Sequence, residues 1–217
     1  DRLASDLEGD TLNLEIKTEK LTHSVVDICE TVCSQHEICI QMLKGKEYQT
    51  LYKVMKKEQK IKKIADIIEH QIVEMTPMMN LTSAGLRRLN VSSHITFELL
   101  YIKDNARTVA SFANHCDDEQ ARGYAKEMEE RLVDSLRKAA LAYQNKSLAE
   151  LNRIGNDIVD VSDLLCRFHD EIEPSEQKQS LMESMDLTLQ CVRKICAQIH
   201  YLYTGEKSFD ITCTAKS

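Results

Sequence analysis

Residues that break helices and strands are scarce in this sequence: its 217 residues include only two prolines and six glycines. β-Sandwiches and doubly wound α/β sheets need many turns, which are built largely from these residue types. The sequence therefore argues against both architectures and favours long helices. Hydrophobic residues make up 42% of the chain, enough to bury a sizeable core in one domain or in two smaller halves.

Three further features are missing. No basic domain is present, and a net charge of −7 argues against a nucleic-acid-binding protein whose affinity rests on neutralised phosphates. No apolar stretch approaches the roughly 18 to 20 residues that cross a bilayer, and no leader peptide opens the chain, so we expect this piece to be soluble. Because it begins at Asp1 without a methionine, we expect a fragment of a longer protein, and a membrane segment ahead of Asp1 stays open.

Cysteines, by contrast, are numerous. Most of them fall inside helical patterns rather than in loops, which favours buried, reduced thiols over a disulfide framework. A reducing cytoplasm is therefore the expected location. The eight are Cys29, Cys33, Cys39, Cys116, Cys166, Cys191, Cys196 and Cys213.

Apolar residues recur every three or four positions in the first half of the chain, which is the period of one face of an α-helix. This pattern predicts helices over residues 12 to 44, 47 to 75 and 82 to 114. Gly45 breaks the first of them, and Pro77 is expected to close the second.

The second half repeats this plan after the polar run HCDDEQ at 115 to 120. Helices are predicted over residues 119 to 143, 147 to 171 and 175 to 203. Ser147 followed by Glu150 is typical of a capping box, and Gly205 suits the position just past a helix end.

An internal repeat is indicated when Pro77 is placed over Pro174, because Leu51 then falls on Leu148 and Val54 on Leu151. The predicted fold is accordingly all-α, with six long helices arranged as two repeated antiparallel three-helix bundles. The first bundle is expected over residues 1–115 and the second over residues 116–217.

The last helix of each half carries a recognisable phrase. "ELLYIKDNA" at 98 to 106 resembles the phrase D-L-E-R-I-G-D-H-A of the PhoU family, which contains the family's acid-x-x-x-acid motif; here Asp104 is the final acid and Leu100 replaces the inner one. The same register in the second half places Asp186 first and Gln190 last. The ending "IHYLYTGE" at 199 to 206 is also similar to the family's usual ending.

The resemblance implies a PhoU-like fold built from two three-helix repeats and a role in phosphate homeostasis. The phrase "NLTSAGLRRLNVSSHITFELLYIKDNA" is similar to PhoU-like domains at the C-terminus of sodium/phosphate cotransporters. It implies a non-enzymatic cytoplasmic regulatory domain, tethered at the inner face of the membrane. Its expected partners are the transporter's membrane domain or other phosphate-uptake proteins.

Family members bind metal clusters through paired surface acids, so the resemblance also implies a surface metal ion at Asp104 and Asp186. Each motif here keeps only one acid, and hard cations need several oxygens at once. A solvated or salt-bridged acid at each position is the alternative, and no other cofactor is expected.

Two other groups of residues invite a functional reading. Cys29, Cys33, His36 and Cys39 resemble zinc ligands, but on one helix the first and last lie about 15 Å apart along the axis, so core packing is expected instead. The outer flank of the second helix carries a stripe of lysines that is either solvated surface or a face that docks on a membrane or a partner. The stripe consists of Lys53, Lys56, Lys57, Lys60 and Lys63.

No nucleophile elbow, glycine-rich phosphate loop or Glu-x-x-His pair is present, so no enzyme is predicted. Two alternatives to phosphate regulation stay open: a helical interaction scaffold unrelated to phosphate, and a metal-binding bundle that gathers acids from several helices. A homodimer also stays open, because the sequence does not locate exposed apolar patches.

Overall fold

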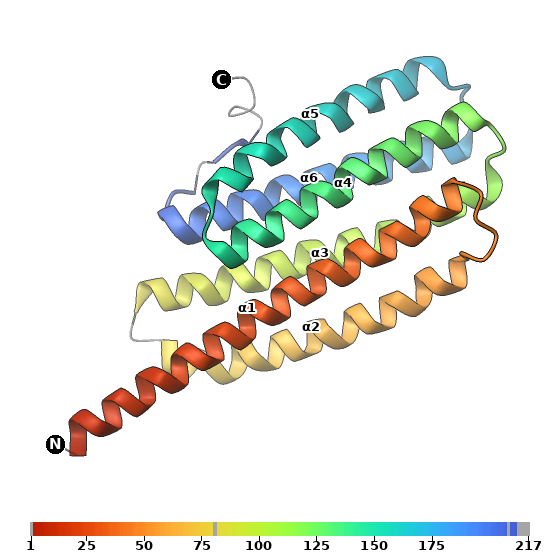
Figure 1. Ribbon diagram of the computed structural model, residues 1–217. Coiled ribbons are helices and arrows are strands. Elements are labelled where there is room, and N and C mark those ends of the chain that lie inside the picture. The colour runs from red at the N-terminus through yellow and green to blue at the C-terminus, as the bar shows by residue number, and fades with distance from the viewer. Residues whose placement is uncertain (1, 80–81, 208, 212–217) are drawn as a thin grey trace.

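The computed structural model describes residues 2–79, 82–207 and 209–211 and contains six α-helices. The first three are α1 (Arg2–Leu43), α2 (Leu51–Met79) and α3 (Ser83–His115), and the second three are α4 (Glu119–Asn145), α5 (Leu148–Glu171) and α6 (Glu176–Thr204). Consecutive helices run antiparallel, and the N-terminal end of α1 extends beyond the other helices (Figure 1). The all-α fold with six long helices is therefore confirmed.

The helix starts and stops follow local chemistry. The side chains of Thr82, Asp118 and Ser175 each accept a hydrogen bond from a backbone N–H in the first turn of α3, α4 and α6, respectively. Gly45 and Gly205 follow α1 and α6 with φ values of 81° and 77°, a region that favours glycine.

Four of the expected boundary details are wrong. The first helix begins at Arg2, ten residues before the predicted start. The side chains of its first turns are exposed, so they form no buried apolar stripe from which the start could be predicted. The second begins at Leu51, where Thr50 accepts from the Lys53 N–H, and it continues past Pro77 to Met79, since losing one hydrogen bond in the last turn is tolerated. Ser147 makes no side-chain capping hydrogen bond, so the capping box does not form.

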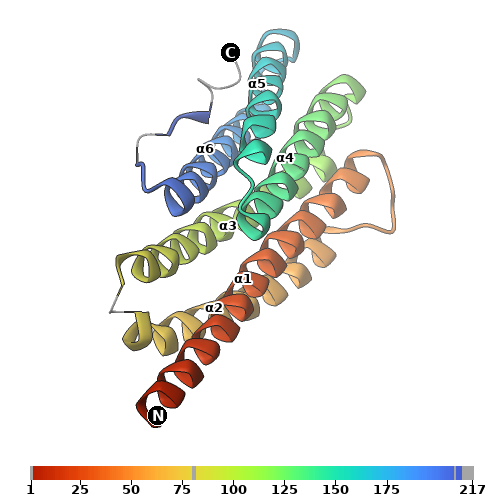
Figure 2. The same cartoon turned by 60° about the vertical axis from the view of Figure 1, so that its left-hand side comes forward.

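The core is built from the stripes that the periodicity indicates. Leu21, Ile28, Val54, Leu99 and Val192, for example, are fully buried. Helices α1, α2 and α3 pack on one another, as do α4, α5 and α6, and the two groups meet where α1 lies along α4 and α3 along α6 (Figures 1 and 2). Burial of these stripes at roughly 1.5 to 3 kcal/mol for each large side chain is the main stabilising contribution.

The two groups share one apolar core. Phe112 of α3 and Phe168 of α5, for instance, lie with ring centroids 6.3 Å apart. Asn105 of α3 also donates a buried hydrogen bond of 2.9 Å to Thr188 of α6. The division of the chain into units 1–115 and 116–217 stays a prediction.

Candidate docking face and metal positions

The lysine face consists of Lys53, Lys56, Lys57, Lys60 and Lys63 on α2. Lys56 and Lys63 are exposed on the side of α2 opposite its buried stripe of Val54, Ile61 and Ile64, and Lys53 and Lys60 are exposed on one flank. Lys57 is half-buried beside the stripe and lines a cavity with Glu37 and Glu130. Within the described residues none of the five forms an ion pair, although Lys53 lies 5.6 Å from the ring centroid of Tyr48. The helix therefore presents uncompensated positive charge to its surroundings.

Asp104 lies on the exposed side of α3, in a cationic setting. Its carboxylate is 3.1 Å from the ammonium of Lys103. Arg107, one turn further on, is also close enough for the Asp104 charge to raise its pKa, after the larger effect of its hydrogen bonds to Glu58 at 2.6 and 2.7 Å. A metal ion at Asp104 would have to compete with both cations.

Asp186 lies exposed on α6, and its partner is the residue that replaces the second acid. The amide of Gln190 donates a hydrogen bond of 3.0 Å to the Asp186 carboxylate. In the part of the chain that the structure describes, no three His, Cys, Asp or Glu side chains come close enough to hold a metal ion together. Leu100 and Gln190 thus stand where a second carboxylate would complete each acid pair.

We expect protein purified without chelators to carry well below one equivalent of iron, manganese, zinc or nickel, because hard cations need several oxygen ligands. Elemental analysis measures this directly. Leu100→Glu combined with Gln190→Asp restores both acid pairs and is expected to raise the bound metal. Stoichiometric metal in the unaltered chain that falls in the Asp104→Asn and Asp186→Asn variants would show that the single acids suffice.

The cysteines of α1 point inward, as the core-packing interpretation predicts. The thiols of Cys29 and Cys39 donate to the backbone carbonyls of Leu136 and Ala106, both at 3.3 Å. A hydrogen bond with Cys29, and then burial, raises the pKa of Cys33 well above its usual value, and burial does the same for Cys39. The thiols of Cys33 and Cys39 therefore stay protonated, whereas metal ligands and nucleophiles need the thiolate.

His36 forms the most deeply buried ion pair of the described residues. Its Nδ1 lies 2.6 Å from the carboxylate of Glu129 on α4, and its Nε2 donates to the carbonyl of Ile102 on α3 at 2.8 Å. Both side chains are almost fully buried. Burial alone would lower the pKa of His36, but the charge and hydrogen bond of Glu129 outweigh it, so the pKa is raised. The pair joins three helices across the two groups.

Sequence reasoning assigned the cysteines around His36 to the core but predicted neither the deep burial of His36 nor its partner. Glu129 is 93 residues away, so no spacing rule connects them. The available signal was a carboxylate on the buried stripe of α4, between Ala125 and Leu132. A buried acid of that kind requires a partner.

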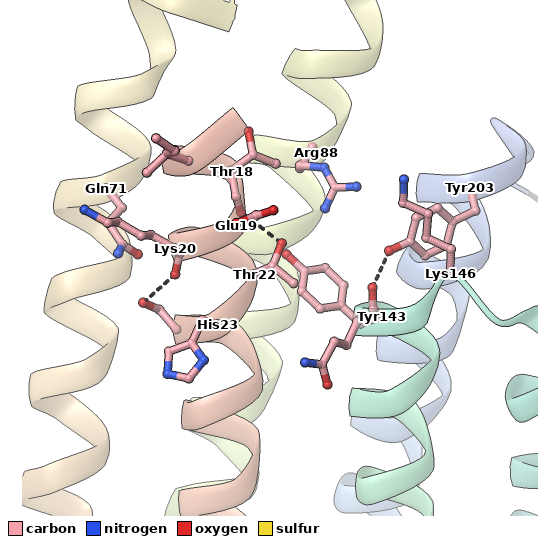
Figure 3. A pocket seen from close by; sticks show the side chains of 13 residues that line it. Thr18, Glu19, Lys20, Thr22, His23, Gln71, Arg88, Tyr143, Lys146 and Tyr203 are labelled. Atoms are coloured by element: carbon pink, nitrogen blue, oxygen red, sulfur yellow. Dashed lines mark hydrogen bonds between the residues drawn. The ribbon is translucent and has the colours of Figure 1, made fainter. Parts of the chain in front are cut away.

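A polar groove of about 840 Å³ lies where α1, α2 and α3 meet the ends of α4 and α6 (Figure 3). Arg88 reaches toward Tyr143 and Tyr203, and Lys146 stands on the opposite wall. Tyr143 is held by a 2.8 Å hydrogen bond with Ser92, and its carbonyl accepts from the hydroxyl of Tyr203. Burial raises the pKa of Tyr143, so it stays a neutral phenol. Glu19, which also lines the groove, offsets part of the positive charge.

No residue of this groove was singled out from the sequence, because its walls come from five helices.

None of the described helices contains a stretch long and apolar enough to cross a membrane.

No protein-family model matches the sequence, and no curated protein matches it. Solved structures do match. The phosphate transport system regulatory protein PhoU from Streptococcus pneumoniae superposes with a TM-score of 0.74 at 14% identity, over 90% of this chain and 99% of that one. PhoU from Pseudomonas aeruginosa gives a TM-score of 0.73 at 13% identity, over 88% and 99%. The chain therefore has a PhoU-like all-α fold of six helices.

Proposed function

We propose that this chain is a cytoplasmic PhoU-like regulatory domain that tunes sodium-dependent phosphate uptake through protein contacts. The observation that carries the proposal is a likeness to PhoU that extends over nearly the whole of both chains. The phrase at 98 to 106, which resembles the PhoU motif, supports it. The lysine face gives the domain a surface with which to dock beside a membrane transporter.

The proposed mechanism uses position rather than chemistry. The buried core is continuous, so the bundle is expected to dock as a unit and to change transporter activity by the contacts that it makes there. The polar groove contains a guanidinium and fixed phenols but no hydroxyl activated by a neighbouring base among its described residues. Regulation by docking accordingly fits the geometry better than catalysis.

Deletion of this segment from its native gene tests the proposal. We expect the initial rate of sodium-dependent phosphate uptake, or its response to external phosphate, to change by about fivefold or more, the usual size of a regulatory coupling. Uptake of labelled phosphate by intact cells, with and without sodium, measures this. Restoring the segment should restore the response, and unchanged uptake on deletion would contradict the proposal.

A second measurement separates the proposal from an interaction scaffold unrelated to phosphate. Affinity purification of the natural protein from membranes should recover a phosphate transporter or its membrane domain. Membrane-spanning segments encoded immediately ahead of Asp1 would favour the cotransporter, whereas an unrelated neighbouring domain would favour the scaffold.

A further inference from the structure

Charge is distributed very unevenly over this protein. Residues 44 to 63 contain eight lysines and two glutamates, a formal charge of +6, whereas the whole chain carries −7. The remaining residues therefore carry −13. A basic face on an acidic body has a strong charge asymmetry, which turns the basic face toward a negatively charged surface and the rest of the protein away from it.

The lysine face is free to make such contacts. One of the two glutamates of this region, Glu58, is buried and bonded through both oxygens to Arg107 of α3, so it does not neutralise the lysines. The other, Glu47, lies in the loop before α2, and Asp66 borders the face at its far end; both are exposed. Lys62, also exposed, adds a further charge on the opposite flank of α2.

Exposed rings and an exposed thioether accompany the lysines at the start of α2. Tyr52 is 73% exposed, Tyr48 is 63% exposed and Met55 is 39% exposed. Because successive helical residues turn by about 100°, Tyr52 lies on nearly the same side of α2 as Lys56 and Lys63. Tyrosine side chains suit the headgroup level of a bilayer, where the ring contacts acyl chains and the hydroxyl stays hydrated.

The position of α2 also suits contact with a flat surface. Helix α2 packs on α1 and α3 and lies at one edge of the bundle, far from α5 (Figure 1). No described helix can cross a bilayer, so contact with lipid would be peripheral. Peripheral binding needs two signals acting together, and this face supplies clustered cations and exposed rings.

We propose that the lysine face, with Tyr48, Tyr52 and Met55, binds the surface of a bilayer that contains anionic phospholipids. The lysines contact headgroup phosphates and carboxylates, and the two rings enter the interface. The inference rests on the docking role proposed above for the lysine face, and the partner of that face is the anionic bilayer surface. Its test contains no transporter, so failure to bind lipid and failure to regulate uptake are separate results.

Sedimentation of the full chain with vesicles measures the binding. We expect binding to phosphatidylcholine vesicles that contain roughly 30% phosphatidylserine and little binding to phosphatidylcholine alone. Raising the salt from about 0.1 M to about 0.5 M should release the protein, because the Debye length shortens. Equal binding to the two compositions, or none to either, would overturn the proposal; the latter result points to an acidic protein as the occupant.

Matched charge variants locate the surface. Lys56→Gln, Lys60→Gln and Lys63→Gln together should lower the partition coefficient roughly 100-fold, since each lysine near the surface contributes a factor of about five. Lys146→Gln, Lys194→Gln and Lys207→Gln make the same change in net charge at exposed sites of the second half and should leave binding almost unchanged. Equal losses in the two sets would show that net charge alone acts. Circular dichroism checks that both variants fold.

A fluorescence measurement tests the depth of the rings, because the natural chain has no tryptophan. Tyr52→Trp should shift to shorter wavelength on anionic vesicles and be quenched by brominated acyl chains. Leu187→Trp, at an exposed site on α6, should show neither change. The opposite pattern would place the contact on another face and overturn the proposal.

Discussion

Replacing Glu129 with alanine is expected to lower the free energy of unfolding by about 3 to 5 kcal/mol, because it leaves His36 buried without its counter-ion. For a chain of this size the midpoint of thermal unfolding should fall by about 6 to 20 °C. Calorimetry at pH 6 measures this. Glu127→Ala, at an exposed site on the same helix, is the control and should change stability by less than about 0.5 kcal/mol. Equal effects of the two substitutions would contradict this role for the pair.

Glu129→Gln separates charge from hydrogen bonding at the same site. A glutamine amide can donate to Nδ1 of a neutral His36 while Nε2–H still donates to Ile102, so this variant should lose less stability than the alanine variant. It should also change the pH dependence. The folded-state pKa of His36 is raised above its ordinary value near 6.5, so the pair's stabilisation is fully present below that pH and is lost as the pH rises through the raised pKa.

The measurement is the difference in unfolding free energy between the natural chain and Glu129→Gln, followed from about pH 6 upward. This difference should shrink as the pH rises, because only the natural chain loses the charged pair. A difference that stays constant over this range would show that His36 does not change its charge there.

Arg122→Met is expected to destabilise the protein by about 3 kcal/mol, because one guanidinium satisfies carbonyls at the ends of two helices. Arg122 on α4 donates to the carbonyls of Ala113 and Cys116 at the end of α3, at 2.5 and 2.9 Å, and to Met42 at the end of α1, at 2.7 Å. Its positive charge also lies near the negative C-terminal ends of both helix dipoles, which is a favourable interaction. Chemical denaturation measures the loss.

Arg131→Met provides the matched control on the same helix. Arg131 is half-exposed, and among the described residues its one ion pair is with Asp160, at 3.8 Å, so its replacement should change stability by no more than about 1 kcal/mol. Arg122→Lys should recover only part of the loss, since a single ammonium cannot span carbonyls on two helices as a planar guanidinium does. A loss at Arg122 no larger than that at Arg131 would show that these carbonyls find other partners.

Much of the fold could be predicted because its signals are local. The stripes through Leu21, Leu99 and Val192 identify helices and their buried sides without any knowledge of what packs on them. The lysine face follows from the same periodicity. The start of α1 was predicted wrongly because an exposed helix end carries no apolar stripe. The capping box at Ser147 was predicted wrongly because Ser147 has the right residue type but does not make the capping hydrogen bond.

What the sequence determined by itself is the set of six amphipathic helices, their buried sides and the basic outer side of α2, since each depends on residues within a few turns of one another. Only the tertiary structure decided that His36 meets Glu129, that Arg122 closes the ends of α1 and α3, and that Arg88 faces two tyrosines. These contacts join residues from different helices, mostly tens of positions apart. Their partners are selected by how whole helices pack, which no short sequence window records.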